Sequence, residues 1–198
     1  MFQILISFTK FIRSKKHHKK SYKKCQQVLK KPAFSFFHLS LILERARPVA
    51  RRVLVGSHPR TSVIDEAESL YYKCDLLEKI QKGSSSSGSE SSHVEKKVRM
   101  VRKEQAVDEV LNYKMCESLI DYDEPGTLVL ASGDGAVGEF SAGFFVTVER
   151  ALKKGWNVEL VTFSPNVSKS YVNKDFRQCW KDQFSIIYLD QFVEELLG

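Results

Sequence analysis

The segment 127–131 constrains the fold more than any other part of the sequence. Its five residues, TLVLA, form a nearly continuous apolar run between Gly126 and Gly133. A short run of this kind is typical of a strand covered on both faces, as strands in a parallel sheet are. Parallel strands need long crossover connections, which are usually helices. We therefore expect the rest of the chain to alternate between short strands and helices.

The apolar pattern on either side of this segment does alternate. Helical spacing predicts helices over 36–46, 64–81, 104–120, 140–154 and 169–183, followed by a terminal helix that ends near Leu197. Apolar or alternating runs predict further strands over 52–56, 97–102, 156–163 and 184–189. This order of elements predicts an α/β fold, a three-layer α/β/α sandwich around a mainly parallel central sheet.

Positive charge is concentrated at the start of the chain. Residues 1–60 hold 15 Lys and Arg against one acid, Glu44, whereas residues 61–198 hold 16 against 23 acids. Ten of the basic residues lie in 10–31, where mutual repulsion opposes a compact fold. We expect residues 1–32 to form a poorly ordered basic arm and residues 33–198 to form the folded domain. Two explanations fit the arm equally well. In the first it contacts phosphates or directs nuclear import, and in the second it is a solvated tail.

The segment 83–93, which reads GSSSSGSESSH, has too few apolar residues to join a core. Both of its flanks are patterned, so we predict a disordered loop within the domain rather than a domain boundary.

The spacing of the cysteines and the length of the apolar runs bear on where in the cell the protein works. The four cysteines, Cys25, Cys74, Cys116 and Cys179, contain no C-x-x-C pair. Their spacing argues against a zinc site and a disulfide framework, and it fits a reducing compartment. The longest apolar run, 33–43, is shorter than the ~20 residues that span a bilayer. We therefore expect an intracellular protein, cytoplasmic or nuclear, without integral membrane association.

Polar residues follow three of the predicted strands, where functional residues of parallel sheets gather. Asp134 leaves the buried strand 127–131 between two glycines, Glu139 precedes the next helix, and Asp108 lies in the first turn of a predicted helix. Carboxylates that converge at one edge would repel each other unless a divalent cation neutralised them. The alternative is structural, because Asp134 can cap a helix and Asp108 can interact with a helix dipole.

Several segments together resemble an NYN domain of the PIN-like nuclease superfamily. They are RPVARRVLVGS (47–57), KEQAVDEVL (103–111), LVLASGDG (128–135) with Glu139 and Phe140, and GWNVELVTF (155–163). The resemblance covers most of residues 36–197. It implies a flavodoxin-like α/β/α domain, an acidic pocket that holds Mg²⁺ or Mn²⁺, and endonucleolytic attack on RNA.

The resemblance also assigns roles to residues. Asp108 takes the position of the helix carboxylate and Asp134 that of the aspartate in the S-G-D motif, both as catalytic residues and metal ligands. Glu139 is a looser catalytic match, because three extra residues separate it from the place of the second acid in S-G-D-x-D-F. RNA, most simply single-stranded RNA, is then expected to contact the matched segments at Ser57, Lys103 and Ser132.

One departure from the family pattern leaves two functions open. Family members open with a strand that ends in Asp, as in F-V-D-x-S-N, but here the first aspartate is Asp65. Residues 2–7 could form that strand with Ser7 at its end, although serine replaces a carboxylate poorly at a hard cation. The chain is either a metal-dependent endoribonuclease or a catalytically inactive RNA-binding or interaction domain. A nucleotide-binding regulator that uses Gly133 and Gly135 is a third reading, which lacks the support of a P-loop pattern.

Overall fold

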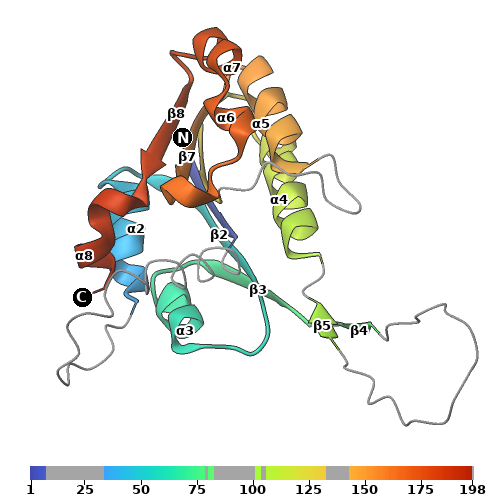
Figure 1. Ribbon diagram of the computed structural model, residues 1–198, viewed down its shortest axis with the longest axis vertical. Helices are drawn as coiled ribbons and strands as arrows, with labels where there is room; N and C mark the ends of the chain where they lie inside the picture. The colour runs from blue at the N-terminus through green and yellow to red at the C-terminus, as the bar shows by residue number, and fades with distance from the viewer. Residues whose placement is uncertain (8–33, 79, 83–100, 104–105, 133–142, 198) are drawn as a thin grey trace, which may run out of the picture.

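A six-stranded parallel sheet forms the centre of the protein (Figure 1). The computed structural model describes residues 1–7, 34–78, 80–82, 101–103, 106–132 and 143–197. The strand order is β3-β2-β1-β6-β7-β8. The strands are β1 (Phe2–Ser7), β2 (Val49–Ser57), β3 (Lys73–Leu77), β6 (Thr127–Ala131), β7 (Asn157–Thr162) and β8 (Phe184–Tyr188). The order runs outward in both directions from β1 and β6, so the boundary between these two strands is the topological switch point of the sheet.

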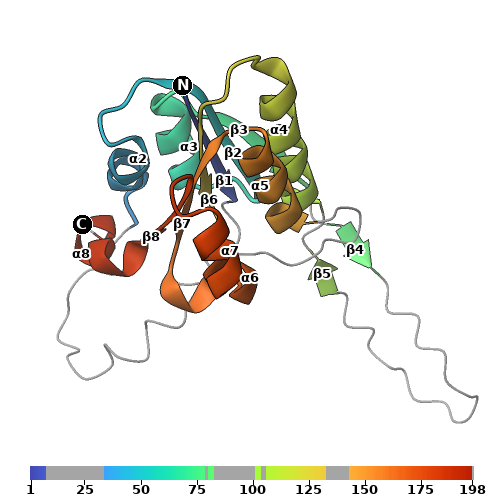
Figure 2. The same ribbon diagram turned by 90° about the horizontal axis from the view of Figure 1, so that it is seen from above.

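Helices cover both faces of this sheet (Figure 2). One face packs against α2 (Phe36–Glu44), α3 (Ser62–Ser69) and α8 (Val193–Leu196). The other packs against α4 (Val107–Asp121), α5 (Gly143–Lys153), α6 (Lys169–Val172) and α7 (Lys174–Cys179). The predicted three-layer α/β/α fold is confirmed.

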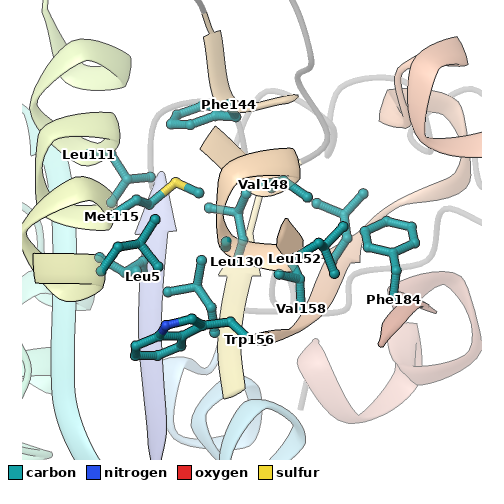
Figure 3. Packing of buried hydrophobic residues seen from close by; sticks show 14 of the residues in the cluster. Leu5, Leu111, Met115, Leu130, Phe144, Val148, Leu152, Trp156, Val158 and Phe184 are labelled. Carbon is teal, nitrogen blue, oxygen red and sulfur yellow. The ribbon is translucent and has the colours of Figure 1, made fainter. Parts of the chain in front are cut away.

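Alternation along the strands builds a separate core on each face. In β6, Leu128 and Leu130 point to the α4 and α5 side, whereas Val129 and Ala131 point to the α2 side, and all four are fully buried. Figure 3 shows the first of these cores, in which Trp156 lies beneath the side chains of α4 and α5. The apolar run 127–131 therefore has the cause expected from the sequence, burial on both faces.

Strand β1 lies between β2 and β6, with Ile6 in register with Leu54 and Ala131. Five of its six residues are buried. The expected arm at residues 1–32 is therefore wrong at its start, because residues 2–7 belong to the sheet. The basic stretch 10–31 lies outside the described residues.

The predicted helix 64–81 is wrong in its second half. Helix α3 ends at Ser69, and Tyr71 takes a left-handed backbone conformation with φ of 63° before β3 begins. The spacing of Leu70, Cys74 and Leu77 imitated a helix, but in β3 Cys74 packs toward one core and Leu77 toward the other. Over so few residues, the apolar positions fit both strand alternation and helical spacing, so the pattern cannot distinguish a strand from a helix.

The predicted strand 97–102 does not join the central sheet. The described part, β5 (Val101–Lys103), pairs antiparallel with β4 (Ile80–Lys82) in a separate two-stranded ribbon. Both strands of this ribbon lie between β3 and α4 in the chain, and the prediction of a disordered loop between them stays a prediction. The Ser-rich stretch 83–93 itself lies outside the described residues.

The end of the chain is more broken than its periodicity predicts. In place of one helix over 169–183, Asn173 separates α6 from α7, and its Oδ1 accepts the backbone N–H groups of Asp175 and Phe176. The terminal helix is likewise divided into a 3₁₀ turn, Leu189–Phe192, and α8.

Candidate functional site

Hydroxyl side chains line the carboxyl ends of the middle strands. Ile6 of β1, Ala131 of β6 and Val161 of β7 are in register. The residues that follow them, Ser7, Ser132 and Thr162, are therefore aligned across three neighbouring strands, and all three are buried. Successive strand side chains alternate between faces. This row of hydroxyls consequently points to the same side as Leu5, Leu130 and Leu160, the side covered by α4 and α5.

Helix α4 brings a carboxylate to this row. The helix begins at Val107, and the buried side chains of Val107 and Leu111 fix its first turn on the sheet. Ser7 Oγ lies 3.3 Å from Asp108 Oδ1 and donates a hydrogen bond to it. The distance is long for an O–H···O bond, so the contact is weak. Asp108 leans toward the end of the sheet, as its helical position predicted, and it meets Ser7 at the switch point.

A buried polar oxygen lies one helical turn beyond this carboxylate. Asn112 follows Asp108 by four residues and therefore lies on the same side of α4. Asn112 Oδ1 is buried and has no hydrogen-bond partner among the residues that the structure describes, and the same is true of Thr147 Oγ1 on α5. Buried oxygens without partners are uncommon in folded proteins. They add unsatisfied acceptors to the side of the sheet that carries the hydroxyl row.

The end of β2 continues the same edge. Ser57, half-buried, follows Val55 by two residues, and Val55 is in register with Ser7. Ser57 therefore lies on the same edge and side as the hydroxyl row. The next residue, His58, turns away: its backbone N–H donates to the carbonyl of Leu77, and its Nε2 lies 3.6 Å from the exposed carboxylate of Glu78.

The other predicted site residues are placed only in part. Lys103 ends β5 in the two-stranded ribbon and does not follow a strand of the central sheet, as the predicted strand 97–102 required. Asp134 and Glu139 lie outside the described residues, so their convergence with Asp108 stays a prediction. Sequence reasoning missed Thr162, whose signal is a hydroxyl residue at the end of an apolar strand.

The described donors fit part of a site for a hard cation. Mg²⁺ and Mn²⁺ take oxygen ligands, carboxylates above all. The carboxyl edge offers the Asp108 carboxylate and hydroxyl oxygens, the correct type of donor atom. Among the described side chains, however, no group of three His, Cys, Asp or Glu residues lies close enough to hold a metal ion. A complete site would need the two acids of the segment that follows β6.

Charged residues toward the amino ends of the strands form ion pairs. Arg47 binds Glu159 of β7 through both carboxylate oxygens, at 2.8 and 2.9 Å, and Arg45 contacts the same carboxylate. Burial alone would raise the pKa of Glu159, but the hydrogen bond from Arg47 and the charges of both arginines bring it below its usual range. Arg52 binds Glu44 in the same bidentate way.

Comparisons with known proteins bear on the fold. No family model matches the sequence, and no curated protein matches it. Within the described residues, no helix is long and apolar enough to cross a bilayer. Among solved structures, the chain is similar to a protein of unknown function from Vibrio parahaemolyticus, with a TM-score of 0.53 and 14% identity, over 94% of this chain and 91% of that one. This likeness supports the α/β/α architecture.

Proposed function

We propose that this chain is an intracellular endoribonuclease of the NYN and PIN-like type, which cleaves single-stranded RNA with the help of Mg²⁺ or Mn²⁺. The position of the Asp108 carboxylate carries the proposal, because the first turn of α4 brings it to the end of β1 at the switch point, where ligands of such sheets bind. The resemblance of the surrounding sequence to NYN domains supplies the reaction.

Each residue then has a stated task. Asp108, Asp134 and Glu139 would hold the cation, which when bound supplies charge stabilisation and an activated water. Ser57, Ser132 and Lys103 would contact the RNA chain beside the carboxylates. The three cysteines within the described residues, Cys74, Cys116 and Cys179, are free. Free thiols agree with the proposed intracellular location.

The inactive RNA-binding domain is the second candidate, and one observation favours it. Ser7 occupies the end of the central strand, where the family pattern has an aspartate, and its hydroxyl already donates to Asp108. A neutral hydroxyl attracts a cation far less than a carboxylate does. The two candidates therefore differ in whether the remaining acids suffice to hold a cation.

Cleavage of a labelled single-stranded RNA tests the first candidate. We expect cleavage with Mg²⁺ or Mn²⁺, none after chelation with EDTA, and none in Asp134→Asn, which keeps the shape of the side chain but removes its charge. Activity that survives EDTA contradicts the proposed reaction. RNA binding without cleavage under any of these conditions supports the second candidate.

A pair of substitutions at Ser7 separates the candidates further. Ser7→Asp adds a carboxylate beside Asp108, whereas Ser7→Asn adds a side chain of the same shape without charge. If the acids form a cation site, Ser7→Asp raises the affinity for Mn²⁺ measured by calorimetry, and Ser7→Asn does not. Equal Mn²⁺ affinities in the two variants would show that this edge does not hold a cation.

A further inference from the structure

Basic side chains divide into two groups, according to whether a carboxylate lies within 4.0 Å. All five arginines between residues 45 and 60 have such a partner, as does Lys114. Among the other described side chains, eight Lys and Arg have none. One of these eight is Lys73 of β3. The other seven belong to the region from α5 to the turn after α7, and all of them are exposed: Arg150, Lys153, Lys154, Lys169, Lys174, Arg177 and Lys181.

Four of these residues gather around the start of β8. Helices α5 and α7 lie side by side in both views (Figures 1 and 2), and the rings of Phe145 and Phe176 are 4.9 Å apart. Gln183 Nε2 donates to the carbonyls of Trp156, at 3.3 Å, and of Leu152, at 3.5 Å. This links the end of α5 to the turn after α7.

The basic residues adjoin these contacts. Lys153 and Lys154 follow Leu152 directly, Lys181 precedes Gln183 by two residues, and the Arg177 guanidinium lies 5.7 Å from the centre of the Phe184 ring. We call Lys153, Lys154, Arg177 and Lys181 the α5–α7 basic surface. Helix dipoles favour Lys153 and Arg177, which lie in last turns, but Lys154 and Lys181 lie beyond the helix ends.

This surface is separate from the candidate site. It lies at the amino ends of β7 and β8, whereas Ser7, Asp108 and Ser132 lie at the carboxyl ends of β1 and β6. A strand of six residues at about 3.3 Å per residue separates the two ends of the sheet by roughly 20 Å. A ligand on the basic surface would therefore leave the site at the other end free.

We propose that the α5–α7 basic surface binds the sugar-phosphate backbone of RNA, as a second contact region remote from the site of cleavage. That the polyanion is RNA rests on the proposed function. Among the described residues, these Lys and Arg side chains have no carboxylate within 4.0 Å, so no ion pair competes with a phosphate for them, and phosphate contacts of this kind are independent of base sequence. The surface holds the strand, and the carboxyl edge of the sheet acts on it.

The salt dependence of RNA binding tests this proposal. Binding of a labelled oligouridylate to the full chain is followed by fluorescence anisotropy in EDTA, over a series of salt concentrations. Each phosphate contact to a single strand contributes about −0.7 to the slope of log K against log salt. For the triple variant K153E/K154E/R177E we expect weaker binding and a slope that is shallower by about 2. Lys73→Glu, on the far edge strand β3, is the matched control and should leave the slope unchanged.

Two results would overturn the proposal: an unchanged affinity and slope in the triple variant, or loss of binding to phosphatidylserine vesicles while RNA binding stays intact. Circular dichroism checks the fold of each variant. If charge reversal unfolds the chain, the neutral set K153Q/K154Q/R177Q serves with the same expected direction. Because EDTA removes cleavage from the measurement, the two proposals can fail separately. Cleavage by the wild type with an unchanged slope rejects the surface, whereas a shallower slope without any cleavage rejects the nuclease.

Discussion

The two ends of the central sheet hold polar side chains in different ways. Toward the amino ends, opposite charges meet, as Arg47 and Glu159 do at 2.8 Å. At the carboxyl ends of the middle strands the buried polar groups are hydroxyls, and Asp108 accepts from one of them. Ion pairs between opposite charges hold the elements of a fold together, whereas ligands of such sheets bind beyond the carboxyl ends of the strands. The difference agrees with the proposed function, in which the amino end maintains the structure and the carboxyl end holds the proposed site.

The largest expected effect is on activity. Asp108→Asn should abolish RNA cleavage and shift the thermal unfolding midpoint little, because the Ser7 hydroxyl can still donate to the amide oxygen. Glu159→Gln, at the other end, should leave cleavage intact at a temperature where the variant is folded. Cleavage assays and thermal unfolding of both variants make the comparison. If Asp108→Asn retains full cleavage, the carboxyl end of the sheet is not the site of cleavage.

The next effect is on stability. Glu159→Gln removes the negative charge that two arginines share, and a hydrogen bond to a charged group contributes about 1.5 to 3 kcal/mol. We expect a loss of that size in the free energy of unfolding by urea. Glu117, which binds Arg51 at 2.6 Å and whose side chain is 24% exposed against 16% for Glu159, provides the control. Glu117→Gln should cost at most about 1 kcal/mol. Equal losses would mean that the amino-end pair at Glu159 is no more structural than a surface pair.

The same pair predicts a dependence of stability on pH. A carboxyl whose pKa is lower in the folded chain stabilises it fully above the unfolded value, about 4.3 for Glu. For Glu159 this contribution is lost as the pH falls through the lower folded value. Unfolding in urea at pH 7 and at successively lower pH should therefore show a smaller decline for Glu159→Gln than for the wild type. Parallel declines would assign acid sensitivity to other carboxyls.

The smallest effect is expected at the hydroxyl row. Ser7→Ala removes one hydrogen bond to the Asp108 carboxylate, which the donor–acceptor distance of 3.3 Å weakens to the strength of an ordinary bond, about 0.5 to 1.5 kcal/mol. We expect a loss near the lower end of that range in urea unfolding. A loss as large as that of Glu159→Gln would make the carboxyl end structural as well.

Sequence reasoning reached the fold because burial on both faces leaves a visible pattern, as in 127–131. It failed at β3, because its five residues fit both the alternation of a strand and the spacing of a helix. It also could not foresee that Arg47 pairs with Glu159, because the two residues are 112 residues apart in the chain. A local count of charge cannot detect such pairs. It likewise could not foresee that Ser7 would meet Asp108, since that contact depends on the packing of α4 on β1.

The position of β1 has a consequence for how the chain folds. Its first partner, β2, follows within about fifty residues, but its second partner, β6, begins at Thr127, whose backbone N–H donates to the carbonyl of Met1. Pairing over so long a stretch of chain is slow, because the entropy of closing the loop is lost before the contacts form. During synthesis, β1 therefore cannot pair with β6 until more than half of the chain has been made.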